Sequence, residues 1–162
     1  MRNVKAIAVF GLAVFATAGF AASVSAQQDK GAAVKERQDT MKRQGGDLKY
    51  IANFAKGTAG DQATASQKAD DLLAINGKIL SLFPPGTSKA DLPDVKTYAK
   101  PTIWTDWNDF KAIVPKLAGL EQQLSDAVKK GDKPMILAAI GNLGKNGCGA
   151  CHSTYREKMP KQ

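Results

Sequence analysis

Both cysteines and the only histidine of this 162-residue chain lie within five consecutive residues, Cys148-Gly149-Ala150-Cys151-His152. A structural zinc site takes about four Cys or His ligands, and the sequence offers none outside this segment. A single histidine also excludes zinc hydrolases with several histidine ligands and haem sites held by two histidines. Two cysteines cannot build a disulfide-dense scaffold. The chemistry of the chain is therefore concentrated in one short segment, which the fold must position.

The pattern C-x-x-C-H is the attachment motif of c-type haem. Its thiols can form thioethers with the two vinyl groups on one porphyrin edge, while the imidazole reaches the iron. On a helix, Cys148 lies four residues from His152 and Cys151 lies one residue away, so all three can address one cofactor. The alternatives are a redox-active C-x-x-C and a plain disulfide, but a thioredoxin-type motif belongs in a βαβ unit, and no strand pattern is present. We expect one covalent haem c, held by Cys148 and Cys151, with His152 as an iron ligand.

Residues 1–26 predict a secretory signal peptide. Arg2 and Lys5 precede an apolar run over 6–22, and the small residues Val24-Ser25-Ala26 form a cleavage site. A permanent membrane anchor is the alternative, but the run is short for a span of about 20 residues. Cleavage removes two positive charges and leaves one domain, 27–162, with a formal charge of +6 instead of +8. We expect this domain in an oxidising, exported compartment, the bacterial periplasm.

The rest of the chain predicts four amphipathic helices, because apolar residues recur at spacings of three, four and seven without strand-like alternation. They are expected at about residues 31–56, 61–83, 105–130 and 132–158, the inward stripe of the third comprising Trp107, Phe110, Val114, Leu117, Leu124 and Val128. Asp61 and Asp132 are N-cap candidates. Four of the seven prolines lie from Phe83 to Pro101 and predict a long crossover loop. This pattern predicts an all-α fold, an antiparallel four-helix bundle with one long crossover.

At this point the chain resembles the class II c-type cytochromes, the family of cytochrome c prime and its low-spin, methionine-ligated relatives. The shared features are the C-x-x-C-H motif near the end of the last helix, Tyr155-Arg156 after it, Arg37-Gln38-x-x-Met41-Lys42 in the first helix, and Phe83-Pro84-x-Gly86 and Ala99-Lys100-Pro101-x-Ile103-Trp104 in the crossover. The resemblance implies a bundle, often a homodimer, that holds haem near the C-terminal helix with His152 as proximal ligand. It makes Arg37 and Arg156 candidates for contacts with the haem propionates. For Arg156, a solvated helix end is the alternative.

The residue that faces the iron opposite His152 separates two functions. Thioether sulfur is the usual partner of histidine in electron-transfer haems. Met135 precedes His152 by about 25 Å along the same helix, and Met159 follows it on the proximal side. Met41 remains, on the inward face of the first helix and four residues after Arg37.

We expect Met41 to be the distal axial ligand of a periplasmic electron carrier with one haem c. The alternative is that Met41 only fills space in the core, as methionines commonly do. The iron is then five-coordinate, and the protein binds nitric oxide or carbon monoxide. An enzyme is not expected, because with His152 used as ligand no obvious acid–base residue is left for peroxide chemistry.

The positive charge favours acidic redox partner proteins. Nucleic acid is not expected as a partner of an exported chain with scattered lysines, and stable membrane insertion is not expected without a second apolar span. Family dimers pair the first two helices, whose outward positions here include Lys42, Gln44, Lys49 and Lys56. Like charges would meet there across a two-fold axis, so homodimer and monomer both remain open.

Overall fold

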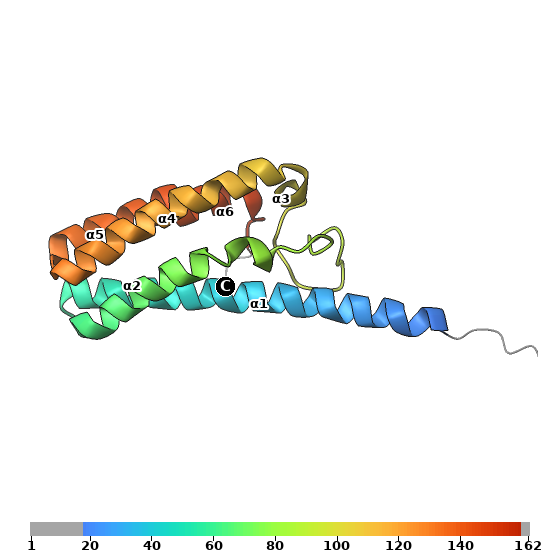
Figure 1. Cartoon of the computed structure of the whole chain (residues 1–162), viewed down its shortest axis with the longest axis horizontal. Helices are drawn as coiled ribbons and strands as arrows, with labels where there is room; N and C mark the ends of the chain where they lie inside the picture. Colours follow the sequence, from blue (N-terminus) through green and yellow to red (C-terminus); the bar gives the residue numbers. More distant parts are fainter. Residues whose placement is uncertain (1–17, 160–162) are drawn as a thin grey trace, which may run out of the picture.

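The computed structural model describes residues 18–159, so most of the predicted signal peptide, 1–17, lies outside the described residues. Within them, the first helix begins earlier than the expected residue 31. It runs without a break from Ala18 to Lys56 as α1 (Figure 1). Among residues 18–159, no helix combines the length and the apolarity that crossing a membrane requires.

The described part of the chain is helical, with one isolated β-bridge and no strand. The elements after α1 are α2 (Gln62–Asn76), the 3-10 helix η1 (Ile79–Leu82), α3 (Thr102–Thr105), α4 (Trp107–Lys130), α5 (Lys133–Asn142), the π-helical segment η2 (Leu143–Gly149) and α6 (Ala150–Tyr155). The last three form one continuous rod (Figure 1). The fold is the predicted all-α four-helix bundle, with the crossover between η1 and α3.

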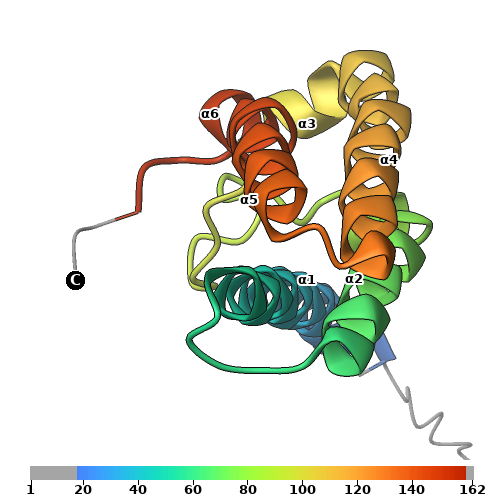
Figure 2. The same ribbon diagram turned by 90° about the vertical axis from the view of Figure 1, so that its left-hand side faces the viewer.

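The four rods pack as the corners of a square. Helix α1 packs against α2 and α5, and α4 packs against the same two helices. The view along the bundle shows this arrangement (Figure 2). The interior is filled by apolar side chains from all four rods, among them Ile51, Leu72, Leu124 and Ile136. Burying each of these contributes about 1.5–3 kcal/mol, which is why amphipathic stripes predict the bundle.

Both predicted N-caps are confirmed. Asp61 accepts a hydrogen bond from Thr64 N at 2.8 Å, and Asp132 accepts one from Met135 N at 2.9 Å. Each satisfies a backbone donor that the first helical turn would otherwise leave unpaired. Between α4 and Asp132 lies Gly131 with a φ of 69°, a left-handed conformation that glycine adopts without strain. The short reversals that make neighbouring rods antiparallel are thus determined locally.

Two predicted helix ends are wrong. The second helix ends at Asn76 and continues only as the 3-10 turn η1, instead of reaching Phe83 as an α-helix. The last helix ends at Tyr155 instead of continuing to residue 158. Its final backbone groups pair with the crossover: Lys100 N donates to Tyr155 O at 3.0 Å, and Glu157 N donates to Tyr98 O at 2.8 Å. These tertiary hydrogen bonds replace the next helical turn.

The π-helical segment η2 also departs from the expected regular α-helix. In a π turn each N–H bonds the carbonyl five residues back, so one extra residue enters the turn. A Cβ at Gly149 would lie 2.6 Å from the carbonyl oxygen of Gly144. Glycine at position 149 therefore permits the close backbone approach within η2, directly beside Cys148.

Candidate haem site

The C-x-x-C-H motif spans the junction of η2 and α6. Cys148 lies in η2, and Cys151 and His152 lie in the first turn of α6. All three side chains are half-buried, and both cysteines are free thiols packed against the hydrophobic core. A Cβ at Gly147 would lie 2.9 Å from Leu117 Cδ1 of α4. Gly147 thus lets η2 approach α4 closely, which holds the motif against the bundle interior.

The electrostatics of the motif differ from those of a disulfide oxidoreductase and suit iron ligation. Burial raises the pKa of Cys148 and raises that of Cys151 to about 11. Burial lowers the pKa of His152, and the neighbouring charge of Arg156 lowers it further. Disulfide oxidoreductases instead need a thiolate with a lowered pKa. A neutral imidazole keeps a lone pair free for a metal.

This donor set fits a haem better than a bare metal ion. Residues 18–159 contain no group of three or more His, Cys, Asp or Glu side chains arranged to hold a metal ion. One imidazole next to two covalent attachment points suffices for a porphyrin iron, because the porphyrin brings its own equatorial nitrogens. Cys148 and Cys151 would hold the porphyrin, and His152 would reach its iron.

The short motifs of the crossover converge beside this site. Trp104 Nε1 donates to the carbonyl oxygen of Phe83 at 3.1 Å. The rings of Phe83 and Phe110 lie 4.8 Å apart between centroids, and those of Phe110 and Tyr155 lie 5.2 Å apart, both edge to face. Because Tyr155 follows His152 by three residues, this aromatic cluster connects the crossover to the haem motif.

Arg37 holds the crossover against α1. Its side chain is only 4% exposed. One terminal nitrogen donates to Thr87 Oγ1 at 3.1 Å, and the other donates to Thr87 O at 3.1 Å and Thr97 Oγ1 at 3.0 Å. The guanidinium carbon lies 4.8 Å from the Phe83 ring centroid. Burial lowers the pKa of Arg37 to about 10, so the group stays charged at neutral pH, and among the described residues no carboxylate pairs with it.

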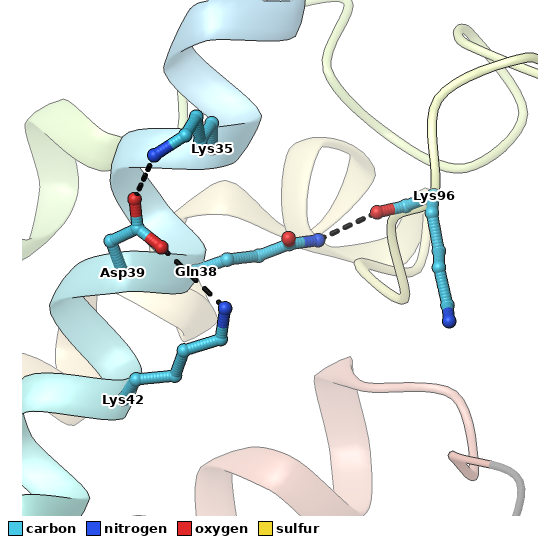
Figure 3. A network of polar contacts seen from close by, with 5 residues as sticks. All are labelled: Lys35, Gln38, Asp39, Lys42 and Lys96. Carbon is cyan, nitrogen blue, oxygen red and sulfur yellow. Dashed lines mark hydrogen bonds and ion pairs between the residues drawn. The ribbon is translucent and has the colours of Figure 1, made fainter.

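Next to Arg37 on α1, one side chain reaches the crossover loop and the others lie on the solvent-exposed face of the helix (Figure 3). Gln38 Nε2 donates to Lys96 O of the crossover at 2.6 Å. Asp39, the next residue along the helix, pairs with Lys35 and, at 3.5 Å, with Lys42. Lys42 is exposed, as predicted.

The two arginines proposed for the propionates lie in different environments. Arg37 is buried in the crossover contact described above, whereas Arg156 is exposed and its backbone forms an antiparallel bridge with Ala99. Contact of either side chain with a propionate stays a prediction.

The methionines also differ in environment. Met41 is half-buried on α1 and packs against the core. Met135 and Met159 are 46% and 54% exposed, so neither is a core side chain. Met41 is therefore the thioether that belongs to the bundle interior in the described part of the chain.

Glu121 and Asn76 are two buried polar residues that carry no recognised motif. Glu121 follows Leu117 by four residues and precedes Val128 by seven, so it occupies the inward stripe of α4. Reading that stripe from apolar residues alone passes over Glu121. A charged residue at an inward helical position was the signal that could have found it.

The family of the chain follows from comparison with known proteins. The family model described as Cytochrome C′ matches residues 32–156. The chain belongs to the cytochrome c′ family. It is 34% identical to cytochrome c-556 of Agrobacterium tumefaciens (strain II Chrys) over 77% of this chain and 97% of the relative. It is 33% identical to cytochrome c′ of Rubrivivax gelatinosus over 81% of this chain and 98% of the relative.

Solved structures agree with this placement. The crystal structure of Rubrivivax gelatinosus cytochrome c′ matches with a TM-score of 0.66 and 32% identity, covering 79% of this chain and 97% of that one. A nitric oxide complex of a cytochrome c prime variant from Alcaligenes xylosoxidans matches with a TM-score of 0.65 and 30% identity, covering 78% and 94%. A cytochrome c′ with ligand-controlled dimer dissociation matches with a TM-score of 0.68 and 26% identity, covering 80% and 97%.

Membership confirms the cofactor: the protein carries one covalently attached haem c, and the chain contains two cysteines. The expected function of an electron carrier with His/Met ligation is wrong. The family is that of cytochrome c′, and its solved members include nitric oxide complexes. A gas ligand needs an iron position that no protein side chain occupies. The physical reason for the error is that an inward methionine is usually a flexible space-filler of the core.

Proposed function

We propose that this protein is a gas-binding cytochrome c′ whose five-coordinate haem iron takes up nitric oxide or carbon monoxide. The observation that carries the proposal is the single histidine, held in a cytochrome c′ fold whose solved relatives include nitric oxide complexes. With His152 on the proximal side, no second imidazole is left in the sequence to close the distal side.

Each site residue has a defined task in this proposal. Cys148 and Cys151 would fix the porphyrin to the last rod, and His152 would hold the iron. When bound, the haem supplies an open coordination position for a diatomic gas. Met41 would pack beside the haem without bonding the iron, and its apolar side chain would exclude water and limit access.

The proposal also covers the location of the protein, its lack of enzymatic activity and its redox partner. The predicted signal sequence over 1–26 would deliver the chain to the periplasm, where we propose that it acts as a binding protein and not as an enzyme. An electron donor that keeps the haem reduced would meet a positively charged surface, since cleavage of residues 1–26 takes the formal charge from +8 to +6. An acidic donor protein is therefore the favoured redox partner.

The test is an absorption spectrum of the purified holoprotein, reduced and then titrated with carbon monoxide and nitric oxide. We expect a high-spin spectrum before the gas is added and stoichiometric gas binding afterwards. A low-spin spectrum in both oxidation states, with no binding of either gas, would overturn the proposal.

The role of Met41 has its own test. Met41→Ala should accelerate carbon monoxide association severalfold, because it removes the side chain that covers the distal side. Met41→Leu, which keeps a similar volume, is the matched control and should bind at nearly the wild-type rate. If Met41→Ala instead changes the spin state of the gas-free protein, the non-bonding role of Met41 is wrong.

A further inference from the structure

A polar contact is buried between α2 and α4, beside the haem motif. Glu121 of α4 is 2% exposed and Asn76 at the end of α2 is 3% exposed. Asn76 Nδ2 donates to Glu121 Oε2 at 2.9 Å and lies 3.4 Å from the carbonyl oxygen of Val114. A carboxyl group buried to this degree normally has a cation as partner. Glu121 has a neutral amide instead.

The charged groups on α2 and α4 do not supply that cation. One turn beyond Glu121, Ser125 donates to Asp70 Oδ1 at 3.0 Å, and Lys129 pairs with the same oxygen at 2.8 Å. Asp70 and Lys129 therefore neutralise each other, and both are about half exposed. The polar contacts between α2 and α4 thus include a solvated ion pair at one end and the buried carboxyl of Glu121 at the other.

The other elements packed against α4 add no cation either. In η2, Lys145 is exposed, and the group that faces Glu121 electrostatically is the thiol of Cys148. In α5, Lys133 lies over the ring of Phe54 at 5.7 Å, and α3 contains no charged residue. Within the described residues, Glu121 forms no ion pair.

Glu121 also lies on the haem side of α4. The preceding turn of α4 contacts η2 through Leu117, at the point where Gly147 permits close approach. The charge of Glu121 contributes to the raised pKa of Cys148, one of the two residues that carry the haem. A change of charge on a haem held at Cys148 would therefore act on this carboxyl, because charges interact strongly in a poorly solvated interior.

We infer that Glu121 is a redox-linked proton site: it binds one proton from solvent when the haem held at Cys148 accepts one electron, and releases that proton when the electron leaves. The electron comes from an external one-electron donor, a reduced protein in the cell or a chemical reductant in the test. One proton and one electron enter together, so the charge of the buried site is unchanged. The inference rests on the covalent haem and not on gas binding.

The physical basis is reciprocal coupling between two charges. An ionised Glu121 stabilises the oxidised haem, which carries one more positive charge than the reduced haem. Reduction removes that charge and makes the carboxylate bind a proton more tightly. Burial raises the pKa of Glu121 to about 7, although the hydrogen bond from Asn76 opposes the shift. The exchange of a proton thus falls in the neutral range.

The test is a potentiometric titration of the full holoprotein, with redox mediators, from acidic to alkaline pH. We expect the midpoint potential to fall with rising pH around neutrality, by at most about 59 mV for each tenfold change in proton activity. Glu121→Gln should flatten this region, since glutamine keeps the shape and cannot ionise. Asp126→Asn, which alters an exposed carboxylate on the same helix, should leave the slope unchanged.

Two further measurements keep the inference falsifiable if Glu121→Gln does not fold. Asn76→Ala removes the hydrogen bond that favours the ionised form and should move the sloping region to higher pH. In the wild type, the infrared difference between reduced and oxidised protein should show a protonated carboxyl band that appears on reduction. An unchanged slope in Glu121→Gln, or no carboxyl band in the wild type, would overturn the inference. Failure of gas binding would leave all of these results intact.

Discussion

Glu121 makes the stability of the bundle depend on pH. Its pKa rises from 4.5 to about 7 on folding, so its contribution to stability is fully present below about pH 4.5 and is lost as the pH rises through 7. Ionisation in the folded state then costs on the order of 3 kcal/mol. In urea unfolding, the free energy of unfolding of Glu121→Gln relative to that of the wild type should rise by about 2–3 kcal/mol from about pH 5 to pH 8. A constant difference across this range would show that Glu121 is not the buried acid.

Arg37 joins α1 to the crossover through a buried network. Arg37→Ala removes the hydrogen bonds that the hydroxyl oxygens of Thr87 and Thr97 accept, and it removes the contact with Phe83. We expect a loss of about 2–4 kcal/mol in the free energy of unfolding. Arg43→Ala, an exposed position on the same helix, should change it by less than about 0.5 kcal/mol. Equal effects of the two substitutions would contradict the assigned role of Arg37.

At the scale of the element, the contact between η2 and α4 positions the haem motif. Gly147→Ala would place a methyl group 2.9 Å from Leu117 Cδ1 and Leu143 Cδ1, and such overpacking typically costs about 1–3 kcal/mol. In the same segment, the methyl group of Gly144→Ala would meet no atom within 4 Å. This substitution should raise the free energy of unfolding by up to about 1 kcal/mol, because alanine has the higher helix propensity. Thermal unfolding and haem content of the two variants check the prediction. A Gly147→Ala protein as stable as Gly144→Ala would mean that η2 can move away from α4 at no cost.

At the scale of the whole molecule, the positive charge of α1 opposes a two-fold symmetric dimer. Lys42, Lys49 and Lys56 are exposed on α1, and one structural relative is a cytochrome c′ with ligand-controlled dimer dissociation. If this chain forms the same kind of dimer, like charges approach one another across the two-fold axis. We expect sedimentation velocity to show a dimer whose fraction increases with salt, because salt screens the repulsion. A monomer at every salt concentration would refute the dimer.

Local patterns in the sequence determined the helices, their caps and the haem motif. An apolar stripe at helical spacing has one stable outcome, burial against another stripe, and the caps at Asp61 and Asp132 act on the next few backbone donors. The motif Cys148 to His152 is equally local, since its residues share one end of a helix. These features need no long-range contact to be recognised.

The tertiary structure alone decided the features that depend on distant partners. The last helix ends at Tyr155 because the crossover takes its backbone groups, and the sequence around Tyr155 contains no stop signal for it. Arg37 became a structural residue because Thr87 and Thr97 surround it. Glu121 became a buried acid because α2 placed a neutral amide where an ion pair would otherwise be expected. Burial and hydrogen-bond partners belong to the packed chain, and one local stretch of sequence does not specify them.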